Sequence, residues 1–193
     1  KVRLATILGT AQSTFTKMPY LRKIWQKNTE EERLLGVSLT GIMDNNVLAK
    51  TVDSPRWLKE LKAQAIDVNR VYADKLGVTA STAITCVKPS GTVSQLVDSA
   101  SGIHARHSEY YIRTVRGDNK DPLTQFMKDS GIPAEPCVMK PDSTTVFSFP
   151  TKSPTGAVTR NDMTALQQLE LWKNYALNWC EHKPSVTITV KDA

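Results

Sequence analysis

The segment PSGTVSQL (residues 89–96) places three hydroxyl side chains around Gly91. It follows a β-branched run at residues 82–88, and its proline ends that run because proline cannot continue a hydrogen-bonded ladder. The glycine is expected to let the backbone turn tightly, so that the following residues begin a helix. A helix start offers free N–H groups and the positive end of the helix dipole. The pattern therefore fits a phosphate-binding turn at the carboxyl end of a strand.

Local chemistry leaves two interpretations of this segment open. One is phosphate binding, and the other, the commoner arrangement, is an ordinary helix start capped by hydroxyl groups. The segment is not a P-loop, because no Gly-Lys-Ser or Gly-Lys-Thr closes a longer glycine-rich loop. Downstream, Arg106 and Arg113 are further candidates for contact with a phosphate.

Histidines and cysteines form no recognisable site. His104 and His107 are three residues apart, but no third ligand follows at a suitable spacing, so we predict loop histidines and no metal. The three cysteines, Cys86, Cys137 and Cys180, contain no CxxC pair. Their spacing indicates neither a zinc site nor a disulfide framework.

Helices and strands alternate along the chain. Helices are predicted from apolar residues at steps of three and four and from capping residues, and strands from Val, Ile and Thr runs. The alternation predicts an α/β fold, with a mostly parallel or mixed sheet packed against helices. The expected helices lie at residues 4–15, 54–76, 121–131 and 164–179, and the expected strands at residues 34–40, 82–88, 110–116, 144–149 and 185–190.

Composition is that of an ordinary soluble domain. The 193 residues are 40% hydrophobic and 23% charged, no apolar run is long enough to cross a bilayer, and the amino-terminal residues do not form a signal peptide. We therefore expect a cytoplasmic protein without a membrane partner.

The net charge of +6 favours polyanionic partners. The lysines and arginines of the chain form no basic run, so nucleic acid is not the expected partner. Both ends look truncated, as in a fragment, one chain of a split protein or a trimmed expression product.

Longer motifs around the PSGT segment resemble the large, catalytic subunit of ribonucleotide reductases. The resemblance is closest to the adenosylcobalamin-dependent class II branch, especially its monomeric triphosphate-reducing type. It extends over nearly the whole chain in the right order. The motifs that carry it are residues 87–94 (VKPSGTVS), 101–107 (SGIHARH), 110–113 (YYIR), 9–15 (GTAQSTF), 32–41 (ERLLGVSLTG), 166–170 (LQQLE) and 185–190 (SVTITV).

The resemblance implies a fold, a reaction and a binding site. The family's fold is a ten-stranded α/β barrel, of which residues 1–193 would form a part truncated at both ends. Its reaction reduces ribonucleoside di- or triphosphates to deoxyribonucleotides for DNA synthesis by thiyl-radical chemistry. The implied cofactor is adenosylcobalamin, only partly contacted by this chain, and a thioredoxin-like protein would be the reductant. The substrate's phosphates would bind Ser90, Gly91, Thr92, Val93 and Ser94.

The chain also departs from the family pattern. The family's radical cysteine lies in a loop similar to Asn-Pro-Cys-Gly-Glu, and no such string occurs here. None of the three cysteines matches a family catalytic position, so no catalytic residue is predicted in this chain. Activity is expected only together with the missing amino-terminal portion of the enzyme. A class I enzyme with a separate metal subunit remains an alternative, as does a non-catalytic nucleotide- or nucleic-acid-binding α/β module.

Overall fold

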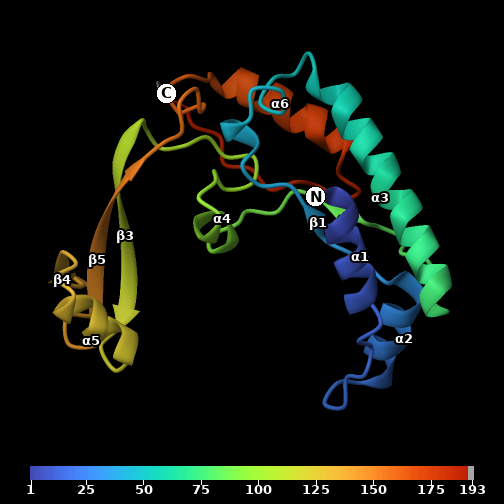
Figure 1. Ribbon diagram of the computed structural model, residues 1–193, viewed down its shortest axis with the longest axis horizontal. Helices are drawn as coiled ribbons and strands as arrows, with labels where there is room; N and C mark the ends of the chain where they lie inside the picture. The colour runs from blue at the N-terminus through green and yellow to red at the C-terminus, as the bar shows by residue number, and fades with distance from the viewer. Residues whose placement is uncertain (191–193) are drawn as a thin grey trace. The chain divides into compact units, whose positions relative to one another are not determined.

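The structure, a computed structural model, describes residues 1–190. Its chain divides into two compact units, one formed by Lys1–Arg106 with the residues from Gly156 onward, and the other by His107–Thr155. In the first unit (Figure 1) the helices and strands are α1 (Val2–Gln12), α2 (Lys23–Glu32), β1 (Val37–Ser38), the 3-10 turn η1 (Ile42–Asp44), α3 (Ser54–Leu76), β2 (Thr85–Cys86), α4 (Val93–Leu96) and α6 (Ala165–Asn178). The one-domain prediction for residues 1–193 remains a prediction.

A short parallel pair, β1 and β2, carries the candidate segment. Val37 lies opposite Thr85 and Ser38 opposite Cys86, and both strands end just before their polar loops. Helix α3 packs against α1 on one side and α6 on another (Figure 1). Parallel strands with helices packed around them are what the alternating pattern predicted for this part of the chain.

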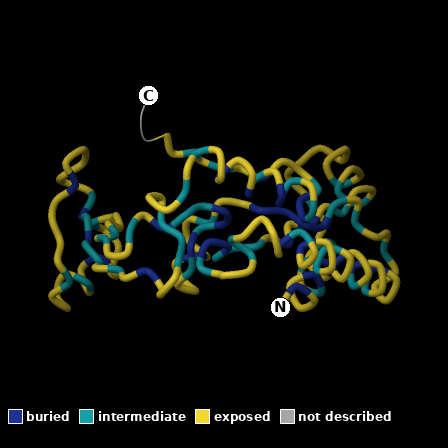
Figure 2. The backbone as a smooth tube through the Cα atoms, turned by 90° about the horizontal axis from the view of Figure 1, so that it is seen from above, coloured by how far each residue is buried: buried dark blue, intermediate teal, exposed yellow. Residues whose placement is uncertain are grey.

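The core of the first unit lies between the helices and this strand pair. Tyr175 and Trp179 are fully buried, and each has a partner for its polar group: Tyr175 Oη donates to the carbonyl of Leu48 at 3.0 Å, and Trp179 Nε1 donates to that of Cys86 at 2.7 Å. Buried aromatic residues thus fix α6 against β2 without an unsatisfied donor. Along the helices, the tube in Figure 2 alternates between buried and exposed colours, as expected of amphipathic elements.

The second unit is an antiparallel sheet of order β3–β5–β4 with one helix. Its elements are β3 (Tyr110–Asp118), α5 (Pro122–Asp129), β4 (Ala134–Pro136) and β5 (Thr144–Lys152). Strand β3 pairs with β5 along its whole length, from Tyr110 opposite Lys152 to Asp118 opposite Thr144. Gly117 lets α5 approach closely, because a Cβ at this position would lie 2.5 Å from Thr124 Oγ1.

Helix predictions agree better with the structure than strand predictions. The helix at residues 54–76 is confirmed, and Gly77 ends it in the left-handed conformation, with a φ of 66°. A capping box between Thr164 and Gln167 opens α6. The expectation of a mostly parallel sheet is wrong for the described residues, because the longest strands pair antiparallel.

The expected strands near the candidate segment are shorter than predicted. Of residues 34–40 and 82–88, only two residues each are β-strand, and residues 185–190 contain none. Side chains bind backbone groups where a neighbouring strand would otherwise do so: Gln168 Nε2 donates to the carbonyl of Thr187 at 2.9 Å, and Glu181 accepts from the amides of Ile84 and Thr85. Among residues 1–190, no helix has the length and apolar character needed to cross a membrane.

Truncation of Leu171 to alanine should destabilise the chain by about 2–5 kcal/mol, because its side chain is fully buried and alanine leaves a cavity. Leu177→Ala is the matched control in the same helix, since Leu177 is 70% exposed, and it should cost about 0.5 kcal/mol or less. Denaturant unfolding of both variants measures the difference. Equal losses would contradict the burial of Leu171 in the core of the first unit.

Candidate functional site

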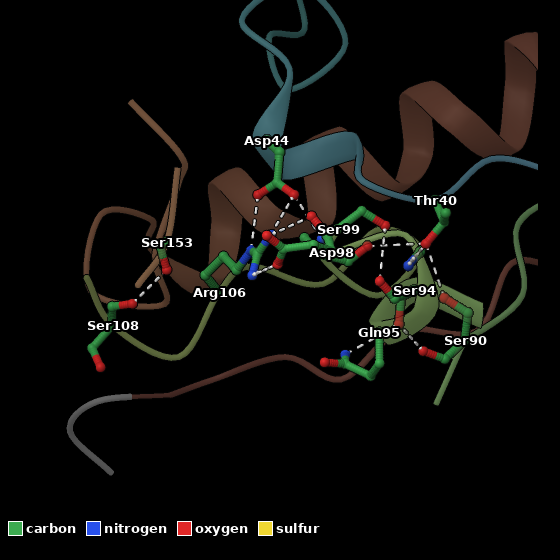
Figure 3. Close-up of polar contacts among 12 residues, drawn as sticks. Thr40, Asp44, Ser90, Ser94, Gln95, Asp98, Ser99, Arg106, Ser108 and Ser153 are labelled. Carbon is green, nitrogen blue, oxygen red and sulfur yellow. Dashed lines mark hydrogen bonds and ion pairs between the residues drawn. The ribbon is translucent and has the colours of Figure 1, made fainter. Parts of the chain in front are cut away.

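The residues of the predicted loop, 90–94, differ in their exposure to solvent. Gly91, Thr92 and Val93 are exposed and Ser90 is half-buried, whereas Ser94 is fully buried. Figure 3 shows that Ser94 turns inward, where its hydroxyl donates to the carbonyl of Ser90. The five predicted residues therefore lie together, but the hydroxyl of Ser94 holds the loop and does not face outward.

Gly91 does not have the role predicted from sequence. Its φ is not positive, so the tight turn does not require glycine, and that expectation is wrong. A Cβ at this position would meet no atom within 4 Å. Gly91 is exposed, and its lack of a side chain leaves room for another molecule to come close to the main chain at this position.

Helix α4 begins within the candidate loop. This helix is a single turn in which the amides of Gln95 and Leu96 both donate to the carbonyl of Thr92, at 3.0 and 3.1 Å. The amides of Val93 and Ser94, which precede them, have no acceptor within the helix. Thr92 is the N-cap residue, yet its side chain makes no capping hydrogen bond. The interpretation of this hydroxyl as an ordinary cap is therefore not supported.

Ser90 is held from behind by two other hydroxyl groups. Its amide donates to Ser101 Oγ at 2.9 Å, and its hydroxyl oxygen lies 2.9 Å from Thr40 Oγ1. Gly102 closes the same loop, because its φ is 53° and a Cβ there would lie 2.8 Å from the carbonyl oxygen of Lys88. Sequence reasoning missed Thr40 as a site residue, since its contact with Ser90 spans 50 positions.

A buried ion pair braces the chain that returns from α4. Arg106 Nε and Nη2 donate to the two carboxylate oxygens of Asp44 at 3.0 and 2.9 Å, and the two side chains are 5% and 14% exposed. The same carboxylate accepts from the amide of Ala100 at 2.7 Å (Figure 3). Arg106 also lies 3.6 Å from the carboxylate of Asp98. Its charge is therefore neutralised inside the fold, and we assign it to the support of the loop.

His104 and His107 have different surroundings. His104 Nδ1 lies 3.1 Å from the carbonyl of Ser101, and its Nε2 accepts from the amide of Thr187 at 3.1 Å. This bonding pattern ties the loop to the chain after α6. His107 is exposed, and it belongs to the second unit with Arg113. Within residues 1–190, no group of three His, Cys, Asp or Glu side chains is arranged to hold a metal ion.

The cysteines are free thiols in buried positions. Burial raises the pKa of Cys86, and burial together with the nearby Cys86 raises the pKa of Cys180 to about 12, so both are protonated at neutral pH. The pKa of Cys137, in the second unit, is lowered by the amide of Met139 and by Arg116. The absence of a catalytic residue from this chain stays a prediction.

Comparisons with known proteins place these features in a family context. No family model matches the chain. It is 30% identical over 172 residues to the adenosylcobalamin-dependent ribonucleoside-triphosphate reductase of Euglena gracilis, covering 86% of this chain and 23% of that protein. The enzyme of the same name from Lactobacillus gasseri is 30% identical over 169 residues, covering 75% of this chain and 22% of that enzyme. A probable enzyme of this kind from Dictyostelium discoideum is 28% identical over 177 residues, covering 90% of this chain and 22% of that protein.

A solved structure agrees in fold. The crystal structure of a B-12 dependent (class II) ribonucleotide reductase superposes with a TM-score of 0.79 at 22% identity, covering 97% of this chain and 30% of that one.

Replacement of Arg106 by methionine should lower the free energy of unfolding by about 3–5 kcal/mol, because Asp44 would be left as a buried charge without its partner. Arg56→Met is the control, since Arg56 forms an exposed pair with Glu60 within α3 and its loss should change stability little. Chemical denaturation of the two variants makes the comparison. A small effect at Arg106 would show that the pair does not brace the loop.

The chain spans about a quarter of the length of these relatives, and over that span the resemblance seen in its motifs is confirmed. Sequence and fold together make it a homologue of part of the adenosylcobalamin-dependent ribonucleoside-triphosphate reductases.

Proposed function

We propose that the protein to which this chain belongs reduces ribonucleotides to deoxyribonucleotides, and that residues 90–94 bind the phosphates of the substrate. The observation that carries the site is the exposed turn after β2, where Gly91 has room for a ligand beside it and immediately precedes Thr92, the N-cap of α4. Backbone N–H groups and hydroxyls in this arrangement suit phosphate oxygens. The ion pair and hydroxyl contacts behind the turn would hold these donors in place before a substrate arrives.

Each predicted residue receives a distinct part in this proposal. Gly91 would let a phosphate reach the main chain, and the amides of Thr92 and Val93 would donate to it. Thr92 is exposed and its side chain makes no capping hydrogen bond, so its hydroxyl would add a donor. Ser94 would stabilise the loop, because its hydroxyl already donates to the carbonyl of Ser90. The proposal covers both triphosphate and diphosphate substrates.

The catalytic barrel is the proposed setting of this loop. We assign β1 and β2 to adjacent parallel strands of a ten-stranded α/β barrel, with the loop at their carboxyl ends. Cys86 and Cys180 are buried protonated thiols close to β2, and we give them packing roles. The radical cysteine and the reducing thiols would come from other parts of the protein.

Adenosylcobalamin is the proposed cofactor, on the strength of the names of the relatives. When bound, it supplies the radical that starts the reaction. The described residues would supply only part of its site: the cavities beside Met163 and Trp172 in the first unit measure 280 and 470 Å³. In this proposal the chain binds and orients the substrate and contacts the cofactor only in part.

The remaining partners follow from the same proposal. They are the missing amino-terminal portion of the enzyme and a thioredoxin-like reductant, acting in the cytoplasm. A class I radical source and a non-catalytic binding module are the alternatives that experiment must separate.

The longer protein that contains this chain should convert ribonucleoside triphosphates to deoxyribonucleotides only when adenosylcobalamin and a dithiol are supplied. The 193 residues alone should give no product, because they lack the radical cysteine loop. Chromatographic detection of the deoxyribonucleotide measures both. Turnover without the cofactor would favour a class I source, and turnover by the isolated chain would contradict the placement of the radical cysteine elsewhere.

Gly91→Ala should weaken binding of inorganic triphosphate about tenfold without loss of stability, because the added methyl meets no protein atom but lies where phosphate must approach. Gly36→Ala is the control, since its Cβ would only touch Cys86 Sγ at 3.9 Å, outside the loop. Titration calorimetry measures the affinity and thermal unfolding the stability. Unchanged affinity in Gly91→Ala would exclude this turn as the binding site, and steeply salt-dependent binding to generic DNA would favour the binding-module alternative.

A further inference from the structure

The hydroxyl of Thr40 is a meeting point of three loop segments. Thr40 Oγ1 lies 2.9 Å from Ser90 Oγ, 2.9 Å from the carbonyl oxygen of Ala100 and 3.0 Å from the amide nitrogen of Gly102. Figure 3 shows Thr40 beside Ser90, with the contact between their hydroxyl groups drawn as a dashed line. Thr40 follows β1, whereas the other three residues follow β2. A single hydroxyl therefore joins the ends of both parallel strands.

Two of these three partners, the carbonyl of Ala100 and the hydroxyl of Ser90, compete for the one hydroxyl proton of Thr40. The amide of Gly102 can only donate and the carbonyl of Ala100 can only accept, so the direction of the contact with Ser90 decides where the proton lies. When Thr40 donates to Ala100, the hydroxyl of Ser90 must donate to Thr40, and Ser90 then offers outside molecules only lone pairs. When Thr40 donates to Ser90, the proton of Ser90 is free to point outward.

Only the second arrangement suits a phosphate. Phosphate oxygens accept hydrogen bonds, so Ser90 binds them only by donating its proton outward. Turning the proton of Thr40 from Ala100 to Ser90 leaves no buried group unpaired, because the carbonyl of Ala100 keeps the amide of Gly41 at 2.7 Å. The resulting chain, from Thr40 to Ser90 to phosphate, has each hydroxyl strengthening the next donor.

We propose that Thr40 is a positioning residue for phosphate binding, acting through Ser90 by turning its hydroxyl proton toward Ser90 Oγ when the anion arrives. The inference rests on the proposed function of residues 90–94 and assigns to it a residue from a different strand. Thr40 itself does not touch the phosphate. No covalent bond changes in this step, and each proton stays on its own oxygen.

A double-mutant cycle separates this role from a general support of the loop. Binding of inorganic triphosphate is measured by calorimetry for the wild-type chain and for Thr40→Val, Thr40→Ser, Ser90→Ala and the double variant Thr40→Val/Ser90→Ala. Thr40→Val and Ser90→Ala should each weaken binding about five- to tenfold, the loss of one hydrogen bond to a charged group. The double variant should bind as Ser90→Ala does, because Thr40 has no other route to the phosphate. Thr40→Ser should stay within about twofold of the wild type, since it keeps the hydroxyl.

Stability is followed in parallel, because Thr40→Val also removes the acceptor of the Gly102 amide. All titrations are made well below the lowest unfolding temperature of the set. Thr14→Val is the matched control: its hydroxyl donates to the carbonyl of Ala11 at the end of α1, far from the loop in sequence, and triphosphate affinity should not change.

The outcomes test the role of Thr40 separately from the proposed binding of phosphate by residues 90–94. A further five- to tenfold loss from Thr40→Val in the Ser90→Ala background would show that Thr40 supports the whole loop, and would overturn the inference while leaving the phosphate site intact. Wild-type affinity in Thr40→Val would overturn it as well. A wild-type chain that binds no triphosphate would remove the proposed site itself, and the role of Thr40 with it.

Discussion

The carboxylate of Asp44 is the contact on which the geometry of the loop depends. It lies on the turn after β1, holds Arg106 through both oxygens and accepts the amide of Ala100, so it fixes two points of the chain that returns from α4. A carboxylate with 14% of its side chain exposed is stable only when such partners surround it. Since Ala100 and Gly102 in turn bond to Gly41, Ile42 and Thr40, the ion pair also sets the distance between the ends of the two parallel strands.

Local signals in the sequence were sufficient for α3 and for the start of α6, but no predicted helix covers α2 (Lys23–Glu32). The apolar spacing of residues 54–76 and Gly77 determine α3, and Thr164 with Gln167 determines the start of α6, because all of these interactions act within a few residues. The structure places the cap of α3 at Asp53, so the helix begins at Ser54, the first residue of the expected range.

Strand pairing and the support of the site depend on contacts that local patterns do not contain. Residues 185–190 have the composition of a strand, yet His104 and Gln168 bind the backbone of Thr187. The contact between Thr40 and Ser90 joins residues 50 positions apart. Sequence located the loop itself, through PSGT and its family resemblance, but it gave Gly91 a turn-forming role that its φ does not require. Which hydroxyl faces solvent was likewise settled only by the fold.

The charges around the loop bear on what kind of anion it suits. Arg106 is the arginine nearest to the loop in sequence, but it is buried and pairs with Asp44 and Asp98. Residues 91–93 carry no charged side chain, so their contacts with a bound phosphate would be made by backbone amides and hydroxyls, and exposed Lys88, two residues before Ser90, is the nearest cation in sequence. A site with so few cations should lose less affinity with salt than a nucleic-acid surface, which gains its affinity from many cations. The net charge of +6 is therefore a property of the whole chain, and the loop is better suited to a terminal polyphosphate group than to a nucleic-acid backbone.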